Sequence, residues 1–286
     1  MYSKQRVSEE IVLTFLAVDN PVMRAELKHQ RHVMRTSRSG WFWIVLAVVM
    51  LLPAFLSALT VIVAGLLRIN LLPVVFTPPF NLVANIGLVS LVIMHFALYI
   101  VVTLVTLALA ASSITREQTS RTWESLLLTE MSARQIVLGK WWATLRALWG
   151  DHVLVLVLRL GFVAWLHWMG SSPDQPDPMR LLIVLLVVTV LTLADNGLTT
   201  VIGILPPVSG RNPVILTLAL ALRLMASVGV LVLTSVIGLL AHDWTPLLMI
   251  ATLVGMAGCV VLTAGAARLA EWAAVRNLAS PQPNKS

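Results

Sequence analysis

The sequence predicts an all-α integral membrane protein with six transmembrane helices and an N-terminal amphipathic helix at the membrane interface. Hydrophobic residues make up 58% of the 286 residues, charged residues make up 12%, and the mean hydropathy is +0.89. Soluble domains do not have such a composition. Apolar runs of the length that a bilayer requires, about 20 residues, recur along the chain. No Asp, Glu, Lys or Arg occurs between Ile69 and Ile114.

The predicted cytoplasmic N-terminal segment, residues 1–40, contains the amphipathic helix. Asn20 and Pro21 predict its start, with Asn20 as the N-cap and Pro21 at the first helical position. Met23 and Leu27 fall on one stripe of this helix. The other side carries the cations Arg24, Lys28, Arg31 and Arg35. This distribution is typical of a helix that lies in the interface with its cations toward lipid phosphates.

Six spans follow and form the predicted transmembrane domain, residues 41–270, before a cytoplasmic tail at 271–286. We expect them at Trp41–Leu67, Leu82–Ser112, Trp141–Trp168, Leu181–Leu205, Val214–Leu240 and Leu247–Ala267. Lysine and arginine are concentrated in the N-terminal segment, the 113–140 loop, the 206–213 turn and the tail, whereas the opposite loops hold only Arg68 and Arg180. Both termini and the 113–140 loop are therefore expected in the cytoplasm.

The net charge of +7 and the pI near 10.5 fit a membrane surface. Because the cations cluster beside apolar spans, anionic lipid headgroups explain them better than a nucleic acid does. We therefore expect membrane lipids, and no nucleic acid, among the partners.

The stretch from Thr115 to Lys140 is the longest polar interruption of the apolar chain. Glu117, Arg121 and Glu124 recur at helical spacing and share one helix face. Ser132 is placed to cap a second short helix. Two short helices joined by a bend make a docking surface for another protein. A solvated loop between two spans is the alternative.

This segment resembles the cytoplasmic coupling segment of ABC-2-type permeases, the membrane subunits of ATP-binding-cassette transporters. The matching positions are Arg116-Glu117, Thr122, Glu124, Leu126-Leu127, Thr129, Ser132 and Ile136-Val137-Leu138-Gly139-Lys140. The family's glycine is Arg121 in this chain, and its proline is Glu130. Both differences fall at bends. The resemblance implies an ATPase-coupling role for these residues, Arg121 and Leu127 included.

The amphipathic helix resembles the Asn-Pro-x-x-x-Arg-Glu-Leu start of many ABC-2 permeases. The corresponding stretch here is Asn20-Pro21-Val22-Met23-Arg24-Ala25-Glu26-Leu27. The resemblance implies that this helix, with Lys28 and Arg31, lies against the ATPase. A generic basic membrane anchor is the alternative.

The ionisable residues within the predicted spans include Asp151, Arg159, Asp195 and Arg223. Placing charged side chains within a membrane costs free energy, so such residues usually have a structural or functional role. Their depths predict that Arg223 is paired with Asp195 or Asp151. The cluster is either a polar layer that lines a translocation path or a buried ion pair that fixes helix packing.

The chain has no G-x-x-x-x-G-K-[ST] loop, no H-E-x-x-H motif, no nucleophile elbow and a single cysteine, Cys259. We expect neither an enzyme nor a bound metal or cofactor. The resemblance implies a separate cytoplasmic P-loop ATPase subunit, which binds ATP and Mg²⁺. Six spans are half of what the family uses, which implies a second permease copy in a homodimer or with a related permease.

The predicted function is that of a permease subunit of an exporter in the bacterial cytoplasmic (inner) membrane. The alternative is a non-transport scaffold or accessory subunit of a larger membrane complex, built on a permease-like body. Arg121 and Glu130 are the sequence features that favour this alternative.

Overall fold

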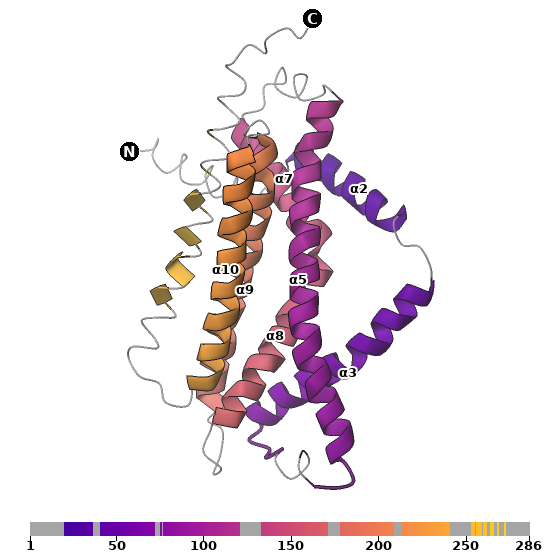
Figure 1. Ribbon diagram of the computed structural model, residues 1–286, viewed down its shortest axis with the longest axis vertical. Coiled ribbons are helices and arrows are strands. Elements are labelled where there is room, and N and C mark those ends of the chain that lie inside the picture. Colours follow the sequence, from indigo (N-terminus) through magenta and orange to yellow (C-terminus); the bar gives the residue numbers. More distant parts are fainter. Residues whose placement is uncertain are drawn as a thin grey trace, which may run out of the picture.

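The computed structural model describes residues 20–36, 41–71, 75, 77–120, 133–170, 178–208 and 213–240, with short stretches between 253 and 272. Regular structure in these residues is entirely helical (Figure 1). The helices are α2 (Pro21–Thr36), α3 (Trp41–Leu66), α5 (Asn81–Thr119), α7 (Ala133–Ala147), α8 (Trp149–Gly170), α9 (Pro178–Val208) and α10 (Pro213–Leu240).

Five of these helices are long and apolar enough to cross a membrane, as expected of an integral membrane protein. Their apolar windows are Val48–Leu66, Asn81–Glu117, Trp149–Met169, Pro178–Pro207 and Ala219–Ile237. The first, second, fourth and fifth predicted spans correspond to α3, α5, α9 and α10. The sixth, Leu247–Ala267, lies mostly outside the described residues.

The prediction of one continuous third span, Trp141–Trp168, is wrong at its beginning. Its residues are divided between α7 and α8, with Leu148 in a turn between the two helices. Lys140 and Arg146 lie in α7. Because these charges interrupt the apolar pattern, only α8 has the composition of a span.

The second span is longer than predicted, because α5 does not end at Ser112. It continues as one helix to Thr119 and carries Arg116 and Glu117 on its last turns. The first of the two predicted short helices therefore begins as an extension of the span. The rest of it, including Arg121 and Glu124, lies outside the described residues. The second is confirmed as a helix, since α7 begins at Ala133.

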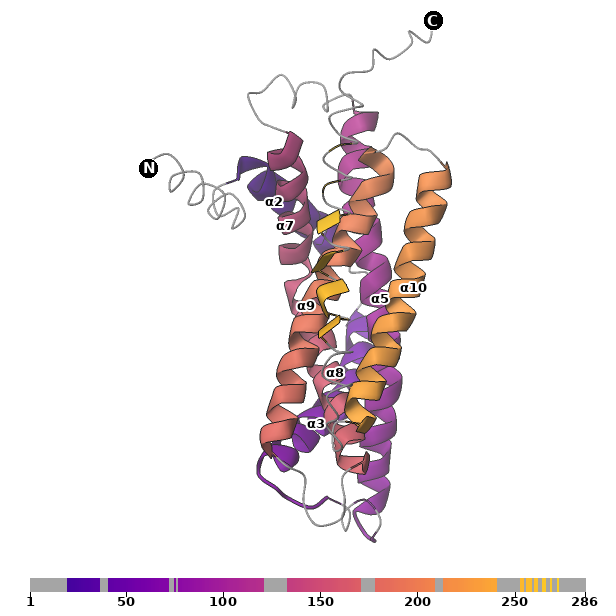
Figure 2. The same ribbon diagram turned by 90° about the vertical axis from the view of Figure 1, so that its left-hand side faces the viewer.

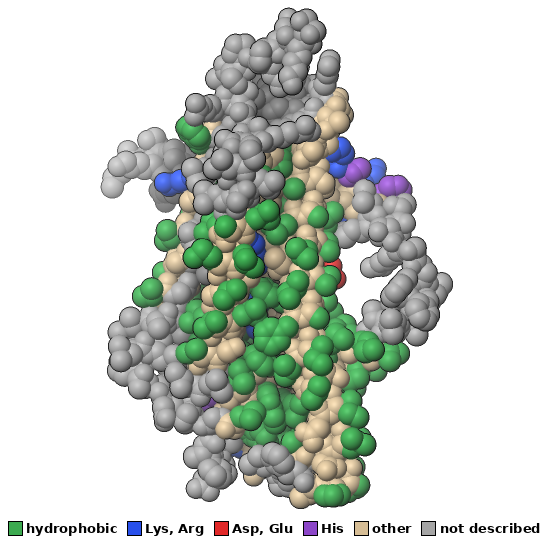
Figure 3. All heavy atoms as spheres, viewed as in Figure 1, with side chains coloured by type: hydrophobic (Ala, Val, Ile, Leu, Met, Phe, Trp, Pro, Cys, Tyr) green, Lys and Arg blue, Asp and Glu red, His purple; other side chains and the backbone are tan. Residues whose placement is uncertain are grey.

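The two helices α8 and α9 form the centre of the bundle. Within their apolar windows 56% and 50% of residues are buried, against 22–28% for α3, α5 and α10. The outer helices expose leucine, valine and isoleucine side chains, which cover much of the face seen in Figure 3. Such surfaces are expected to contact lipid, where apolar exposure carries no penalty.

In Figures 1 and 2, α5, α9 and α10 run along the long axis, while α3 crosses obliquely. Helices α2 and α7 lie together at one end, beside the C-terminal part of α5. We call this the α2 end.

Glycines permit close approach between helices at two places in the bundle. A Cβ atom at Gly161 of α8 meets Ala58 of α3, including its backbone, and one at Gly203 of α9 meets Ala110 and the backbone of Leu107 in α5. Small residues let helix backbones approach within a membrane. These two contacts help fix α3 on α8 and α5 on α9.

Candidate functional site

The start of α2 is fixed both to its own helix and to α7. The Asn20 Oδ1 atom accepts hydrogen bonds from the backbone N–H groups of Val22 (2.9 Å) and Met23 (3.4 Å), which confirms the predicted N-cap. Its Nδ2 atom donates to the Gln135 carbonyl at 2.7 Å, in the first turn of α7. Gly139 lies against the same side chain, since a Cβ there meets Asn20 Nδ2 at 2.9 Å.

The buried face of α2 is partly polar. Met23 is buried and packs with Ala143 of α7, as the predicted apolar stripe requires. Glu26 and Gln30, however, are each only 3% exposed. The helix therefore packs against the protein through two polar side chains, whereas the cationic residues Arg24, Lys28 and Arg31 are exposed on its other side.

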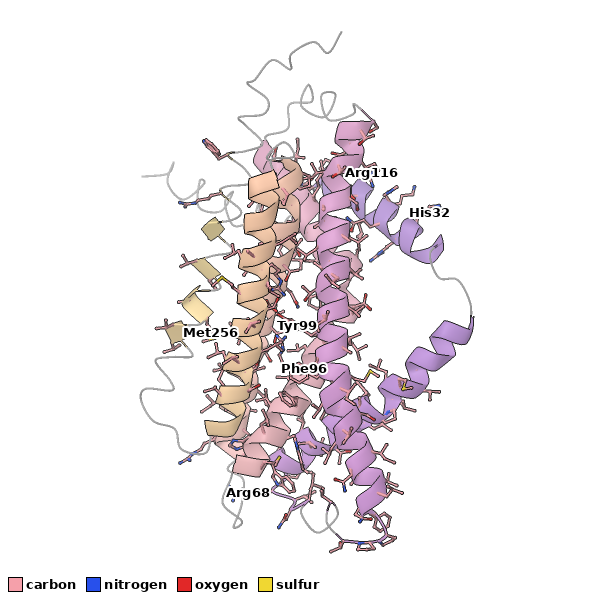
Figure 4. The ribbon with its side chains drawn as sticks, viewed as in Figure 1. His32, Arg68, Phe96, Tyr99, Arg116 and Met256 are labelled. Carbon is pink, nitrogen blue, oxygen red and sulfur yellow. The ribbon has the colours of Figure 1, made fainter. Side chains whose placement is uncertain are left out.

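A buried polar junction joins α2 to α5 and α7. The Glu26 Oε2 atom lies 2.8 Å from Arg116 Nη2 and 3.4 Å from Lys140 Nζ. The same Lys140 Nζ atom lies 2.7 Å from Glu117 Oε1 and donates to the Ser113 carbonyl at 2.9 Å. We call the set of Glu26, Gln30, Ser113, Arg116, Glu117, Lys140 and Thr144 the polar junction. Figure 4 labels Arg116 where α5 passes α2.

The junction balances its own charges. It contains two carboxylates and two cations, and the Lys140 side chain is fully buried while that of Arg116 is 39% exposed. Gln30 Nε2 donates to Glu26 Oε1 at 3.0 Å and to Thr144 Oγ1 at 3.3 Å. Buried charges are tolerated when they are paired and hydrogen-bonded in this way. The junction is thus a fixed contact between the three helices.

The predicted coupling residues fall into two groups. The structure gathers Arg116, Glu117, Gly139 and Lys140 at the α2 end, where they meet Asn20 and Glu26 of the predicted interface helix. The remaining residues lie outside the described part of the chain: Arg121, Thr122, Glu124, Leu127, Thr129 and Ser132.

A second polar cluster lies among the spans. Arg223 Nη1 of α10 lies 2.5 Å from Asp195 Oδ1 of α9, so of the two predicted partners, Asp195 and Asp151, Arg223 pairs with Asp195. Arg159 of α8 has its Nη1 atom 3.9 Å from Asp195 Oδ2 and donates from it to Thr192 Oγ1 at 3.1 Å. We call Tyr99, Thr103, Arg159, Thr192, Asp195 and Arg223 the intramembrane cluster.

Tyr99 of α5 completes this cluster and was not anticipated from the sequence. Its hydroxyl accepts a hydrogen bond from Arg223 Nη2 at 3.1 Å, and its ring lies 4.6 Å from Arg159 Cζ. One aromatic side chain thus contacts both arginines, through a hydrogen bond and a cation–π contact. A signal was present, because the chain has only two tyrosines and this one lies within a long apolar run. Figure 4 labels Tyr99 between α5 and α10.

Asp151 does not share the buried position predicted for it. It is exposed, whereas Arg159 and Asp195 are fully buried. Asp151 and Arg159 are eight residues apart on α8, which at about 100° per residue rotates them roughly 80° apart on the helix. The prediction from sequence compared only the depths of these residues along their helices and did not include their rotation about the helix axis.

An apolar groove of about 510 Å³ lies between α3 and α5, apart from both polar clusters. Leu56, Val83 and Trp165 are among its lining residues, and Ser57 and Thr60 supply hydroxyl groups. Its apolar lining suits a hydrocarbon chain.

No family model, curated protein or solved structure matches this chain. Among the described residues, no group of three or more His, Cys, Asp or Glu side chains is placed to hold a metal ion. The two polar clusters and the groove are therefore the observations on which a function can be argued.

Proposed function

We propose that the chain is the permease subunit of an ATP-driven transporter of the ABC-2 type, coupled to a separate P-loop ATPase. The observation that carries this proposal is the polar junction. Residues 121–132, the centre of the resemblance, are bounded by α5 and α7. Glu26 ties both of these helices to α2 through Arg116 and Lys140. The two elements that the resemblance assigns to the ATPase therefore form one unit.

In this proposal the α2 end faces the cytoplasm. The ATPase docks on residues 121–132 and on the exposed cationic side of α2, which carries Arg24, Lys28 and Arg31. Because α2 is ion-paired to α5 and α7, a force on either docking element moves all three helices together. Helix α5 is continuous from the docking end through the membrane, so it transmits that movement to the spans.

The rest of the assembly follows from the same reasoning. The chain contributes six spans, Leu247–Ala267 being the sixth, with both termini in the cytoplasm. A second permease copy completes the path, ATP and Mg²⁺ bind to the partner subunit, and the complex exports its substrate across a bacterial cytoplasmic membrane. Tilting of the spans opens and closes the path between the two halves.

A non-transport scaffold is the second candidate, and the junction also offers an argument for it. Glu117 and Lys140, which the resemblance assigns to coupling, are engaged with each other within the chain at 2.7 Å. Lys140 is fully buried and cannot reach a partner in this arrangement. The burial of Lys140, together with Arg121 and Glu130 in place of the family's glycine and proline, favours an accessory subunit that has a permease-like body but binds no ATPase.

Co-purification of the full chain in mild detergent from its natural host distinguishes the two candidates. The preparation is identified by mass spectrometry and assayed for ATP hydrolysis. The transporter proposal predicts a stoichiometric P-loop ATPase that is lost when Glu124 is replaced by alanine. Arg180→Gln, an exposed position at the other end of the bundle, is the matched control and keeps the ATPase.

A preparation that contains other membrane subunits but no ATPase contradicts the transporter proposal and supports the proposal of a non-transport scaffold. An ATPase that remains bound to the Glu124→Ala variant removes the coupling role from the 121–132 segment.

A further inference from the structure

The intramembrane cluster carries one more positive than negative charge. Arg159, Asp195 and Arg223 are 0%, 0% and 3% exposed, and Asp195 is the only carboxylate that the described residues place with the two arginines. A buried charge without a counterion is strongly disfavoured in a low-dielectric interior. The excess charge therefore needs a partner.

The excess falls on Arg159. Arg223 makes a hydrogen-bonded ion pair with Asp195 Oδ1 and donates from Nη2 to Tyr99 and to Thr103 (3.3 Å), which leaves only its Nε unbonded among the described residues. Arg159 reaches Asp195 Oδ2 only at 3.9 Å, which is beyond hydrogen-bonding distance. Its one hydrogen bond to a side chain runs from Nη1 to Thr192.

The other two nitrogens of Arg159 have no hydrogen-bond partner among the described residues. Nε and Nη2 are both buried and both unbonded. Their N–H groups lie on the same edge of the planar guanidinium and point in one direction. That edge matches the two oxygens of a carboxylate or phosphate group and binds them bidentately. The Tyr99 ring covers the flat face of the group, so the edge is the part left for a ligand.

Another buried side chain without hydrogen bonds among the described residues, His95, lies one helical turn before Tyr99 on α5. His95 is 1% exposed, and both its ring nitrogens lack hydrogen bonds. It stacks on Phe162, with ring centroids 5.0 Å apart, and Phe162 follows Arg159 by three residues on α8. His95 also precedes Tyr99 by four residues on α5, so helical spacing puts it on the side that faces Arg159. A neutral imidazole supplies one further N–H.

We propose that Arg159 binds an oxyanion inside the bundle, a carboxylate or phosphate group, through its Nε and Nη2 atoms, with His95 as a further donor. The anion neutralises the excess positive charge of the cluster. This binding site does not depend on the proposed transport function, because the oxyanion binds without any ATPase.

The test uses the purified full chain in a nonionic detergent free of carboxylate and phosphate. Binding of three probes is measured by equilibrium dialysis and by the thermal unfolding midpoint: sodium hexanoate, inorganic phosphate and the uncharged analogue hexanamide. The proposal predicts saturable binding of one hexanoate or one phosphate per chain, with a raised midpoint, and no such effect of hexanamide. Which anion binds more tightly assigns the carboxylate or the phosphate class.

Three variants locate the site. Arg159→Met removes the guanidinium edge formed by Nε and Nη2. It is expected to weaken anion binding about tenfold or more, because charge-assisted hydrogen bonds are lost. Arg159→Lys keeps the charge but loses the bidentate edge, so its anion affinity falls between that of the unaltered chain and that of Arg159→Met. Arg180→Gln, an exposed arginine outside the cluster, binds as the unaltered chain does.

Three results overturn the proposal: no saturable binding of either anion, binding of hexanamide as tight as that of hexanoate, or unchanged binding by Arg159→Met. Stability without added anion gives an independent check, because Arg159→Met removes the excess charge and leaves Asp195 paired with Arg223. An unfolding midpoint for Arg159→Met as low as that of Asp195→Asn contradicts the assignment of the excess charge to Arg159.

Discussion

Lys140 Nζ lies 3.4 Å from Glu26 Oε2, and neither side chain is more than 2% exposed. The two residues are 114 positions apart in the sequence. Glu26 belongs to the amphipathic helix and Lys140 to the end of the segment that resembles a coupling region. Their contact packs α2 against the helical body.

Replacing Glu26 by glutamine is expected to destabilise the protein. The substitution leaves the buried Lys140 with Glu117 alone and deprives Arg116 of its 2.8 Å partner. Breaking a buried ion pair costs about 3 kcal/mol. Thermal unfolding in detergent measures this loss. Lys28→Gln, on the exposed side of the same helix, should change stability by less than about 0.5 kcal/mol. Equal midpoints for the two variants would show that the junction contributes no stability.

Gly139→Ala is expected to loosen α2 from α7. A Cβ at Gly139 lies 2.9–3.1 Å from three atoms of the Asn20 side chain, which must then move and strain its bond to the Gln135 carbonyl. Asn20→Ala removes the obstacle and also the cap, at a cost of about 1 kcal/mol. The double variant should therefore lose less stability than the sum of the two single variants. Strict additivity of the unfolding free energies argues against this contact.

Three glycines within the spans should respond differently to alanine. Gly161→Ala and Gly203→Ala push a methyl group into the backbone of the facing helix, so both should lose stability by about 1–3 kcal/mol, as overpacked sites do. Among the described residues, no atom outside the surrounding turn of α10 lies within 4 Å of a Cβ at Gly229, so Gly229→Ala should be neutral or stabilising by up to about 1 kcal/mol. Detergent thermal shifts rank the three variants. Destabilisation by Gly229→Ala equal to that by Gly161→Ala contradicts the packing seen here.

Asp195→Asn is expected to be the most damaging single change in the intramembrane cluster. It leaves Arg159 and Arg223 buried without a carboxylate, at a cost of about 3–5 kcal/mol. Adding Arg223→Met removes one of the two charges and should recover part of the loss. Folded yield and unfolding midpoint are the readouts, and export activity is scored separately. An Asp195→Asn protein that is stable but inactive shows that the cluster serves transport rather than packing.

Local chemistry made some features predictable from the sequence. Asn20 and Pro21 define a helix start through groups that lie within four residues of each other, and the structure places the cap as expected. Counting depth along the spans limited the predicted partner of Arg223 to Asp195 or Asp151, and the structure pairs it with Asp195.

Features that depend on how helices are rotated against one another were missed. Tyr99 enters the intramembrane cluster because α5 turns that face toward α8 and α10, which no count along one helix reveals. Glu26 was assigned to the interface helix by its motif, but its burial depends on α7, more than a hundred residues away. The third span was misplaced because hydropathy averaged from Trp141 onward, across Arg146, conceals the turn at Leu148.

The most direct test of the central claim asks whether the polar junction holds the two ATPase-docking elements together. Co-purified ATPase is quantified per chain for the unaltered protein, for Glu26→Gln and for Arg180→Gln, all extracted under conditions in which each remains folded. The account predicts one ATPase per permease chain for the unaltered protein and for Arg180→Gln, and a severalfold loss for Glu26→Gln, because α2 is no longer fixed beside α5 and α7. The account is contradicted if no ATPase co-purifies with the unaltered protein, or if the Glu26→Gln variant retains as much ATPase as the unaltered protein does.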